Sequence, residues 1–344
     1  MKMRRISIDS IPGFRLGNAQ DKNAATGCTV IICEEGAVAG VDVRGGGPAT
    51  RETDLLRSEN TVDAINAVVL SGGSAFGLEA SSGVMKFLSK KNIGFDAGGI
   101  FVPIVCGASL FDLNVGRSDV FPDFKMGIEA CNNAYNNDFE TGNIGAGCGA
   151  TCGKLLGKER SMKTGLGSYA CGDDFIKVGA ISAVNACGDI YNGAGNIIAG
   201  LRTSEGDSIL GSIKALKGIV HEHSSDATEI QESISDIIRN AYEGRARENT
   251  TISCLITNAK LTKSQSNKLA SILHDAYARA IKPVHSTLDG DTIFVMSTGE
   301  IEVNFDAFAA LATDVMQYAI IDAALSCEEA YELPAACDIL AKGN

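Results

Sequence analysis

The chain has 344 residues, 45% of them hydrophobic and 21% charged, with 39 glycines, 6 prolines and no tryptophan. A chain of this length and composition can bury a large core, which excludes collagen-like, coiled-coil and disordered proteins. Acidic residues outnumber basic ones by 42 to 30, for a formal net charge of −12, and no stripe of Lys and Arg is present. A nucleic-acid partner is therefore not expected.

The sequence shows no membrane or export signal. The basic residues near the N-terminus precede no apolar stretch, and nowhere do the ~18 consecutive apolar residues of a membrane helix occur. Eleven cysteines are scattered along the chain, and those in apolar runs are predicted to be buried thiols: Cys28, Cys33, Cys106, Cys187 and Cys254. We expect a cytoplasmic protein in which these thiols stay reduced.

Short apolar and alternating runs predict both strands and helices. Strands are expected at 29–33, 37–43, 64–70, 102–106, 177–184, 250–257 and 292–297, the first two forming a hairpin turned at 34–36. Helices are expected from a turn at 71–73 to about 90, at 124–134, at 269–281 and from 308 to at least 318. Because hairpins accompany the strand–helix alternation, we predict stacked α and β layers, not a strict parallel sheet.

The segment 221–248 differs from the rest of the chain. It is polar and charged, with one weak amphipathic stretch at 230–238, and is predicted to be an exposed connection. His221 and His223 lie in it without an obvious third ligand, so no metal site is predicted there. His274 and His285 have no serine elbow nearby, which gives a Ser-His-Asp triad little support.

A glycine-rich run at 142–154 ends in Lys154. A Walker A loop is excluded, because Cys148 replaces its first glycine and Leu155 replaces its Ser or Thr. A loose dinucleotide-binding pattern is present, but no clear strand leads into it. The alternative is a tight backbone corner, which by itself does not explain the lysine at its end.

Two other features are open to a functional and a structural interpretation. Asp289-Gly290-Asp291 is either a hairpin turn or a pair of carboxylates that meets a cation at the start of the strand 292–297. The junction of Asn249 and Thr250 is either an ordinary loop-to-strand junction or a cleavage site. If that bond is cut, Thr250 becomes an N-terminal residue whose hydroxyl is a nucleophile and whose α-amine is its base.

Several motifs, taken in order along the chain, resemble the DmpA-type peptidase family. That family includes L-aminopeptidase/D-esterases, β-peptidyl aminopeptidases and nylon-oligomer hydrolases. The motifs are Ile11-Pro12-Gly13, VDVRGGG at 41–47, LSGGSAFGLEA at 70–80, the glycine-rich run at 142–154, Asn249-Thr250-Thr251, and LDGDT at 288–292.

The resemblance implies an α+β fold, a four-layer αββα sandwich of the N-terminal-nucleophile-like type. It implies a single domain over residues 1–344 that cleaves itself between Asn249 and Thr250 into a large chain, 1–249, and a small chain, 250–344. The implied activity is that of an aminopeptidase-like hydrolase of short peptides or amides, with Thr250 as nucleophile and without a metal or organic cofactor. Relatives form tetramers, so a homo-oligomer is expected.

The chain most resembles the nylon-oligomer hydrolase branch, in which a lysine, an asparagine and two aspartates surround the nucleophile. These match Lys154, Asn185, Asp289 and Asp291. Lys154 is expected to disfavour the protonated α-amine by charge repulsion, and Asn185 to donate a hydrogen bond to the oxyanion. The two aspartates are expected to orient the Thr250 hydroxyl and Lys154 and to help hold a substrate ammonium group.

One position departs from the family pattern. Several relatives carry a tyrosine where this chain has Phe76, which supplies no hydroxyl and is predicted to contact substrate. The identity of the substrate therefore stays open. Two alternatives to a hydrolase are an acyl transferase of the ornithine acetyltransferase type and a small-molecule-binding scaffold that never cleaves itself.

Overall fold

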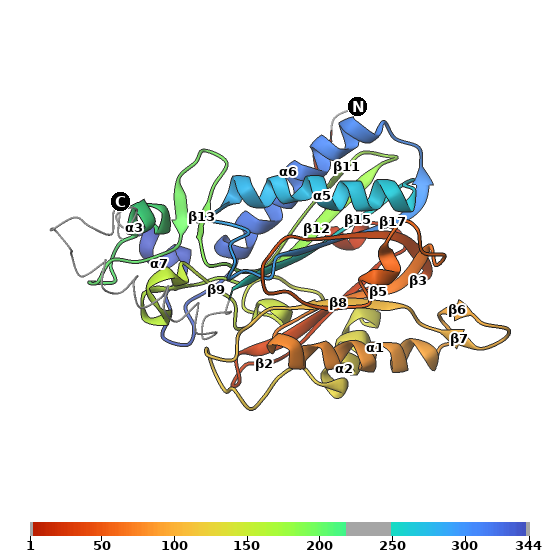
Figure 1. Cartoon of the computed structure of the whole chain (residues 1–344), viewed down its shortest axis with the longest axis horizontal. Coiled ribbons are helices and arrows are strands. Elements are labelled where there is room, and N and C mark those ends of the chain that lie inside the picture. The colour runs from red at the N-terminus through yellow and green to blue at the C-terminus, as the bar shows by residue number, and fades with distance from the viewer. Residues whose placement is uncertain (1–2, 218–248, 342–344) are drawn as a thin grey trace.

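The structure is a computed structural model that describes residues 3–217 and 249–341 (Figure 1). Its centre is a ten-stranded sheet in the order β1–β11–β12–β15–β17–β3–β5–β8–β4, with β2 added by pairing with the first part of β3. These strands are β1 (Arg4–Arg5), β2 (Arg15–Asp21), β3 (Thr26–Val43), β4 (Ala49–Arg51), β5 (Ala64–Ser71), β8 (Val105–Ser109), β11 (Leu166–Gly172), β12 (Lys177–Asn185), β15 (Thr250–Ala259) and β17 (Thr292–Ile301). Smaller sheets pair β6 (Phe95–Asp96) with β7 (Phe101–Val102), β9 (Thr151–Cys152) with β10 (Met162–Lys163), and β13 (Asp189–Tyr191) with β14 (Ile197–Ala199) and β16 (Ile281–Lys282).

Polar residues cap the starts of the longer helices. Thr262 and Gln265 form a capping box, in which each side chain accepts the backbone N–H of the other. Single side-chain caps, Asp123 and Asn304, start two further helices. The helices are α1 (Ala80–Ser89), α2 (Phe124–Tyr135), α3 (Ser212–Lys217), α5 (Lys263–Ala280), α6 (Phe305–Leu325) and α7 (Ala336–Leu340).

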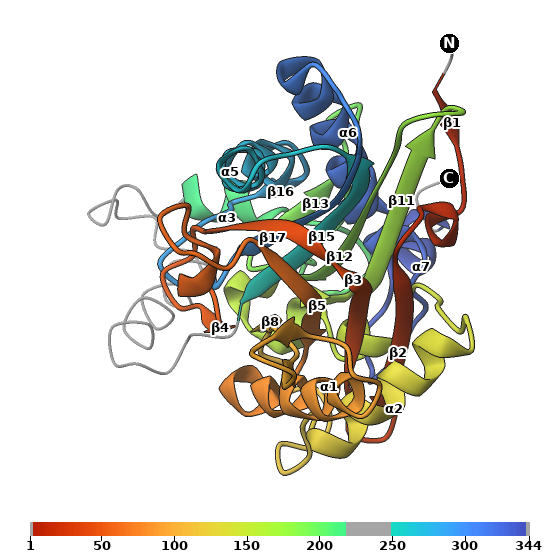
Figure 2. The ribbon, with the colours of Figure 1, turned by 90° about the vertical axis from the view of Figure 1, so that its right-hand side faces the viewer.

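The elements stack in four layers, with helices outside and two layers of strands between them (Figure 1). Helix α6 covers β11 and β12, and α5 covers β17 and the second half of β3, whereas α1 and α2 cover β2, β5, β8 and the first half of β3 (Figure 2). A separate apolar cluster fills each gap between layers. The cluster between the strand layers joins Ile252 and Phe294 on one side to Ile31 and Val68 on the other. The predicted αββα sandwich is therefore confirmed.

The hairpin predicted at 29–43 is wrong. Strand β3 is continuous, and its pairing with β5 shifts register between Ile32 and Ala37. The segment 34–36, predicted as a turn, forms a bulge in which Gly36 has φ +86°. The first half of β3 pairs with β2 and the second half with β17, so this strand connects the two strand layers.

Most other predicted elements lie close to their expected bounds, but α5 starts six residues before the predicted Leu269, and the helix expected after the turn at 71–73 begins as a 3-10 helix at Ser74–Glu79 before α1. The strand expected at 102–106 starts instead at Val105, because Pro103 lacks the N–H that a continuous ladder needs. The residues before it, β7, pair with β6. The connection predicted at 221–248, including its helix at 230–238, lies outside the described residues.

Two further expectations concern burial. All five cysteines predicted as buried thiols are buried and form no disulfide. Helix α6 is long and apolar enough to cross a membrane by length and composition, but more than half of its most apolar window is buried in the described structure. It packs on β11, β12 and α5 as a core helix.

Candidate active site

The ends of three neighbouring strands bring predicted site residues to one edge of the sheet. Asn185 ends β12 and Thr250 starts β15, and these two residues are direct partners in the antiparallel ladder. Strand β17 runs parallel to β15, so the residues that lead into it reach the same edge (Figure 2). An isolated parallel bridge between Asn249 and Asp289 extends this pairing beyond the strands.

The peptide bond between Asn249 and Thr250 lies between a hydroxyl and a backbone donor. Thr250 is buried, and its hydroxyl donates a hydrogen bond to the carbonyl oxygen of Asn249. The same oxygen accepts the N–H of Gly290 at 2.9 Å. A Cβ at Gly290 would lie 2.7 Å from the Thr250 hydroxyl oxygen, so the close approach requires glycine. The carbonyl oxygen of Asn249 thus accepts both a hydroxyl and a backbone N–H.

The glycine-rich run at 142–154 places Lys154 beside Asn185. The Lys154 ammonium donates to the backbone oxygen of Asn185 at 3.0 Å and to its side-chain Oδ1 at 2.8 Å. The corner depends on Gly153, which has φ +68° and whose Cβ would lie 2.1 Å from the carbonyl carbon of Gly200. The tight backbone corner therefore places the Lys154 ammonium beside Asn185, the ladder partner of Thr250.

The orientation of the Asn185 amide follows from its neighbours. Both Lys154 and the backbone N–H of Thr151 are donors, so they select the oxygen of the amide. The Nδ2 group then points away from them and donates to the carbonyl oxygen of Phe111 at 2.7 Å. These contacts fix the orientation of the amide.

Asp289 and Asp291 are fixed by different donors. Asp289 Oδ2 accepts the backbone N–H of Ser286 at 2.8 Å and the Ser286 hydroxyl at 2.5 Å. Asp291 Oδ1 accepts the N–H of Thr251 at 2.8 Å. Burial, and next the charge of Asp291, raise the pKa of Asp289, and the hydrogen bonds from Ser286 and the Lys154 charge oppose this rise.

The hairpin-turn interpretation of 289–291 is wrong, because β16, the strand before this segment, pairs with β13, whereas β17 after it pairs with β15 and β3. Glycines from the motif at 41–47 pack directly against it. The N–H of Gly47 donates to the Asp289 carbonyl oxygen at 2.8 Å, and a Cβ at Gly45 would lie 2.2 Å from that oxygen. The two motifs form one tightly packed backbone unit that fixes the aspartates.

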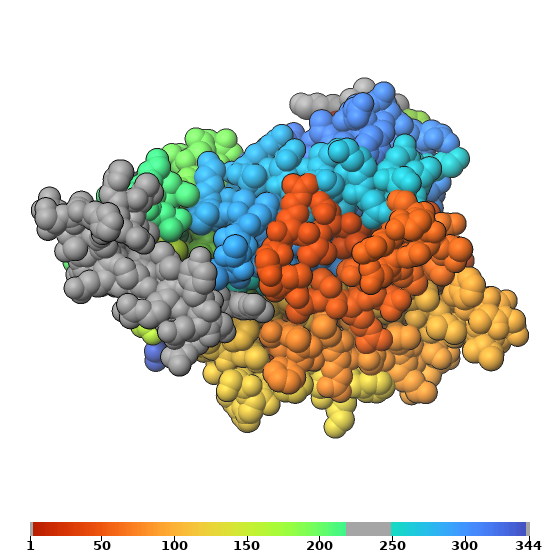
Figure 3. All heavy atoms as spheres, viewed as in Figure 1, coloured from red at the N-terminus to blue at the C-terminus, as the bar shows by residue number. Residues whose placement is uncertain are grey.

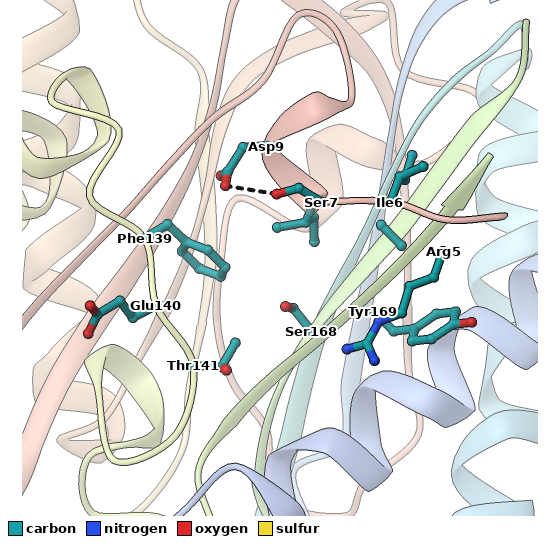
Figure 4. A pocket seen from close by; sticks show the side chains of 11 residues that line it. Arg5, Ile6, Ser7, Asp9, Phe139, Glu140, Thr141, Ser168 and Tyr169 are labelled. Atoms are coloured by element: carbon teal, nitrogen blue, oxygen red, sulfur yellow. Dashed lines mark hydrogen bonds between the residues drawn. The ribbon is translucent and has the colours of Figure 1, made fainter. Parts of the chain in front are cut away.

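Phe76 is placed differently from the other predicted residues. Its side chain is 61% exposed and stacks on Phe121, with ring centroids 4.9 Å apart. A cavity of about 470 Å³ lies elsewhere, beside β11 and the N-terminal segment (Figure 4). Its lining includes Arg5, Asp9 and Tyr169 and none of the predicted site residues.

Three residues of this region are not among the predicted site residues. Gly290 and Ser286 become part of the site only through the backbone geometry around the two aspartates. His285 contacts Asp291 through its ring Nδ1, 2.8 Å from Oδ2. Its position six residues before Asp291 is the one hint that the sequence contains, and it is weak.

Solved structures with the same architecture define the class of fold. The L-aminopeptidase D-Ala-esterase/amidase of Ochrobactrum anthropi, described as a variant among the Ntn-hydrolase fold, covers 98% of this chain and 93% of its own, with TM-score 0.67 and 17% identity. A β-aminopeptidase of Burkholderia sp. covers 96% of this chain and 91% of its own, with TM-score 0.65 and 16% identity. The chain has this variant of the Ntn-hydrolase fold.

Sequence comparison identifies the family. The model of peptidase family S58 matches residues 7–332, and the chain belongs to that family. An aminopeptidase of Mycobacterium leprae is 33% identical over 96% of this chain and 93% of its own length. A 6-aminohexanoate-oligomer endohydrolase of Kocuria sp. is 29% identical over 91% of this chain and 84% of its own. The resemblance to DmpA-type peptidases is confirmed, and the protein is a hydrolase of amide bonds.

Proposed function

We propose that this hydrolase cleaves itself between Asn249 and Thr250 and then uses Thr250 as an N-terminal nucleophile. The proposal depends on one observation above all. The Thr250 hydroxyl contacts the carbonyl oxygen of the preceding residue, and the Gly290 N–H donates to that same oxygen at 2.9 Å.

Self-cleavage begins when Thr250 Oγ1 attacks the carbonyl carbon of Asn249. Negative charge then develops on the carbonyl oxygen, where the Gly290 N–H is already in place to stabilise it. The C–N bond breaks, the nitrogen takes up the hydroxyl proton as it becomes the α-amine, and an ester joins Asn249 to Oγ1. Water hydrolyses this ester, leaving a carboxylate on Asn249 and free hydroxyl and amino groups on Thr250.

In turnover the α-amine of Thr250 takes the hydroxyl proton while Oγ1 attacks the amide carbon of a substrate. The proton passes to the departing amine, and water hydrolyses the resulting ester. The Lys154 ammonium, held on the cross-strand partner of Thr250, favours the neutral form of the α-amine because like charges repel. Asp289 supplies a buried carboxylate on the opposite side, next to Asn249.

The substrates we propose are short peptides and linear amino-acid oligomers. Relatives named aminopeptidase and 6-aminohexanoate-oligomer endohydrolase support this class. Phe76 is exposed and stacked on Phe121, which makes an apolar surface without a hydroxyl, and we assign it to substrate contact. We also expect the enzyme to be a cytoplasmic homo-oligomer.

Mass spectrometry of the denatured protein tests self-cleavage. The 35.9 kDa chain is expected to give pieces of about 26 and about 10 kDa, in proportion to chain length, the smaller one starting with Thr250. Thr250→Ala is expected to stay intact. The matched control is Thr251→Val, since the buried Thr251 hydroxyl has no hydrogen-bond partner within the described chain. An uncut wild-type chain, or a cut Thr250→Ala chain, contradicts the proposal.

Activity of the cut protein tests the reaction class. Aminoacyl anilides, dipeptides and 6-aminohexanoate oligomers are incubated with and without an added amine acceptor. Free acid as the main product in both cases supports a hydrolase, whereas acyl transfer to the amine favours a transferase. A cut protein that is inert toward all of these substrates contradicts the proposed substrate class.

A further inference from the structure

Two histidines form a continuous chain of hydrogen bonds behind the nucleophile strand. His274, on α5, has Nε2 at 3.2 Å from the carbonyl oxygen of Asp42 and Nδ1 at 3.2 Å from Nε2 of His285. His285 has Nδ1 at 2.8 Å from Asp291 Oδ2. Asp291 Oδ1 in turn accepts the N–H of Thr251, the residue after the nucleophile.

The protons of this chain can be assigned from its ends. A carbonyl oxygen only accepts, so His274 Nε2 must donate to Asp42. His274 is buried, and burial lowers its pKa, so its ring holds one proton and its Nδ1 is an acceptor. His285 Nε2 must then donate to it. With Nε2 protonated, the contact of 2.8 Å between His285 Nδ1 and Asp291 requires a second proton between those two atoms.

The surroundings of the Asp291 carboxylate decide whether this second proton is on Asp291 or on His285. Asp291 accepts the backbone N–H of Thr251 at 2.8 Å and that of His285 at 3.2 Å, besides facing the imidazole. Donors on both oxygens favour the ionised carboxylate. The proton therefore belongs on the His285 ring.

Other charged and titratable groups lie around the contact between His285 and Asp291, but none of them takes the place of either residue in it. Tyr277 of α5 stacks on the His285 ring at 5.9 Å between centroids, and burial raises its pKa far above the usual range, which keeps it neutral. From β3 and the residue after it, the Asp42 carboxylate lies 4.0 Å from His274 Nε2, and Arg44 pairs with that carboxylate at 2.9 Å. Asp289 is a neighbour on the same segment, and its carboxylate is held by Ser286.

The backbone of His285 is built for this contact. It has φ +56°, in the left-handed region that residues other than glycine seldom adopt, although asparagine, aspartate and histidine do so more often than most. In this conformation both its N–H and its ring Nδ1 reach the same oxygen of Asp291. A strained conformation that aims two donors at one carboxylate is typical of a residue that holds a functional group in place.

We propose that His285 is an imidazolium whose ion pair with Asp291 positions the start of β15 for the reaction at Thr250. His285 is thus a positioning residue, acting through Asp291 and the Thr251 N–H. With the charge of Asp291 compensated by His285, Asp289 is left as the carboxylate that balances Lys154, and also the α-amine once it has taken the hydroxyl proton. The protonation state of His285 is inferred from its hydrogen bonds alone. Its positioning role rests, in addition, on the proposed function of Thr250 as nucleophile.

Nitrogen NMR of histidine tests the protonation state without any need for activity. The protein contains four histidines, so a Thr250→Ala chain labelled with ¹⁵N-histidine gives few signals, and those of His285 are identified by their loss in His285→Asn. We expect both ring nitrogens of His285 to be protonated at about pH 7–8, where a free histidine is neutral, and one ring nitrogen of His274 to be unprotonated. A neutral His285 ring at that pH overturns the proposal.

Two substitutions test the positioning role. His285→Asn tolerates the left-handed backbone and can still donate one hydrogen bond to Asp291, whereas His285→Ala cannot. Self-cleavage is expected to slow by about tenfold in the Asn variant and more in the Ala variant. The acid limb of the rate profile should also move to higher pH in the Asn variant, because an uncompensated Asp291 makes Asp289 harder to ionise.

A purely structural role predicts a different pattern. In that case self-cleavage falls only in step with thermal stability, and the pH profile of His285→Asn matches that of wild type, which would overturn the positioning role. Unfolding temperatures of both variants separate these outcomes. If Thr250 is not the nucleophile, the wild-type chain stays uncut. The NMR experiment still tests the protonation state of His285, because it does not depend on cleavage.

Discussion

At the scale of a single residue, Gly290 links the geometry around Asn249 to the proposed self-cleavage. Its N–H holds the Asn249 carbonyl oxygen, and its missing side chain leaves room for the Thr250 hydroxyl. In Gly290→Ala the new methyl group occupies a position 2.7 Å from Oγ1, so the hydroxyl must move away. We expect self-cleavage to slow by about 10²-fold, the typical effect of misplacing a reacting group by about 1 Å.

The control for this prediction is Gly193→Ala. Gly193 is exposed, and a Cβ there meets nothing within 4 Å, so self-cleavage is expected at the wild-type rate. Both variants are followed by denaturing electrophoresis after timed incubation. Equal cleavage of Gly290→Ala and wild type would show that the close approach of hydroxyl and glycine does not govern the reaction.

The surroundings of a second residue, Asp112, lead to a prediction about how the stability of the protein depends on pH. It is almost fully buried, one oxygen accepts the Gly73 N–H at 2.7 Å, and burial raises its pKa to about 6. Its pKa in the unfolded chain is ~3.9, so the folded state binds more protons between about pH 4 and pH 6. This group therefore makes the protein less stable as pH rises through that window, by up to about 3 kcal/mol.

Asp112→Asn is expected to be more stable than wild type at pH 8 by about 1–3 kcal/mol, because the amide stays neutral and can still accept from Gly73. The loss of stability between about pH 4 and pH 6 should also become smaller. Urea unfolding at several pH values measures both effects. Asp119→Asn, in an exposed ion pair with Arg117, serves as control, and a steeper pH dependence in Asp112→Asn would contradict this account.

At the scale of elements, a buried polar network joins α5 to β15, the strand that starts at Thr250. The Tyr277 hydroxyl lies 2.7 Å from Ser253 Oγ on β15, which donates to Ser182 Oγ on β12 at 2.7 Å. The same hydroxyl reaches the carbonyl oxygens of Thr251 at 3.3 Å and Thr292 at 3.4 Å. One side chain thus ties a helix to the strands on both sides of the predicted site.

Tyr277→Phe is expected to lower the free energy of unfolding by about 1–2 kcal/mol, since it leaves buried polar groups with fewer partners. Ser253→Ala should have an effect of similar size, and the double variant should lose less than the sum, because both changes break the same contact. Denaturant unfolding of the three variants measures this coupling, with the exposed Tyr318→Phe as control. Additive losses would show that the network is not cooperative.

The elements also show which parts of the fold the sequence determines locally. The apolar runs behind β5, β12, β15 and β17 predict these strands near their observed bounds, because each run is buried on both sides. Residues 34–36 have turn composition, yet β3 continues through them as a bulge since β5 pairs with it on both sides. That outcome is set by tertiary pairing, which local composition does not contain.

The candidate site likewise has features that the sequence predicts and features that only the tertiary structure sets. The family motifs point to Lys154, Asn185 and the two aspartates, but their meeting at one edge depends on the parallel pairing of β15 with β17. His285 is harder to predict, because its partner His274 lies on a helix and its role comes from a chain of contacts across three elements. Spacing along the chain does not encode such contacts.

At the scale of the whole molecule, the proposed cut falls in the middle of the sheet. Strands β15 and β17, both on the C-terminal side of the proposed cut, lie between β12 and β3, which are both on its N-terminal side. Their side chains also fill the apolar clusters on both faces of this layer. Figure 3 shows the C-terminal part of the chain, in cyan and blue, packed directly on orange-red segments from its N-terminal part.

The two chains are therefore expected to stay together after cleavage, because separating them would break two backbone ladders and expose the apolar core. Native size-exclusion chromatography should give the same elution volume for cut wild type and uncut Thr250→Ala, while denaturing electrophoresis separates two chains only in wild type. Release of the piece of about 10 kDa under native conditions would contradict this arrangement of strands. Co-elution would mean that the cut changes one peptide bond and leaves the fold that surrounds the new N-terminus in place.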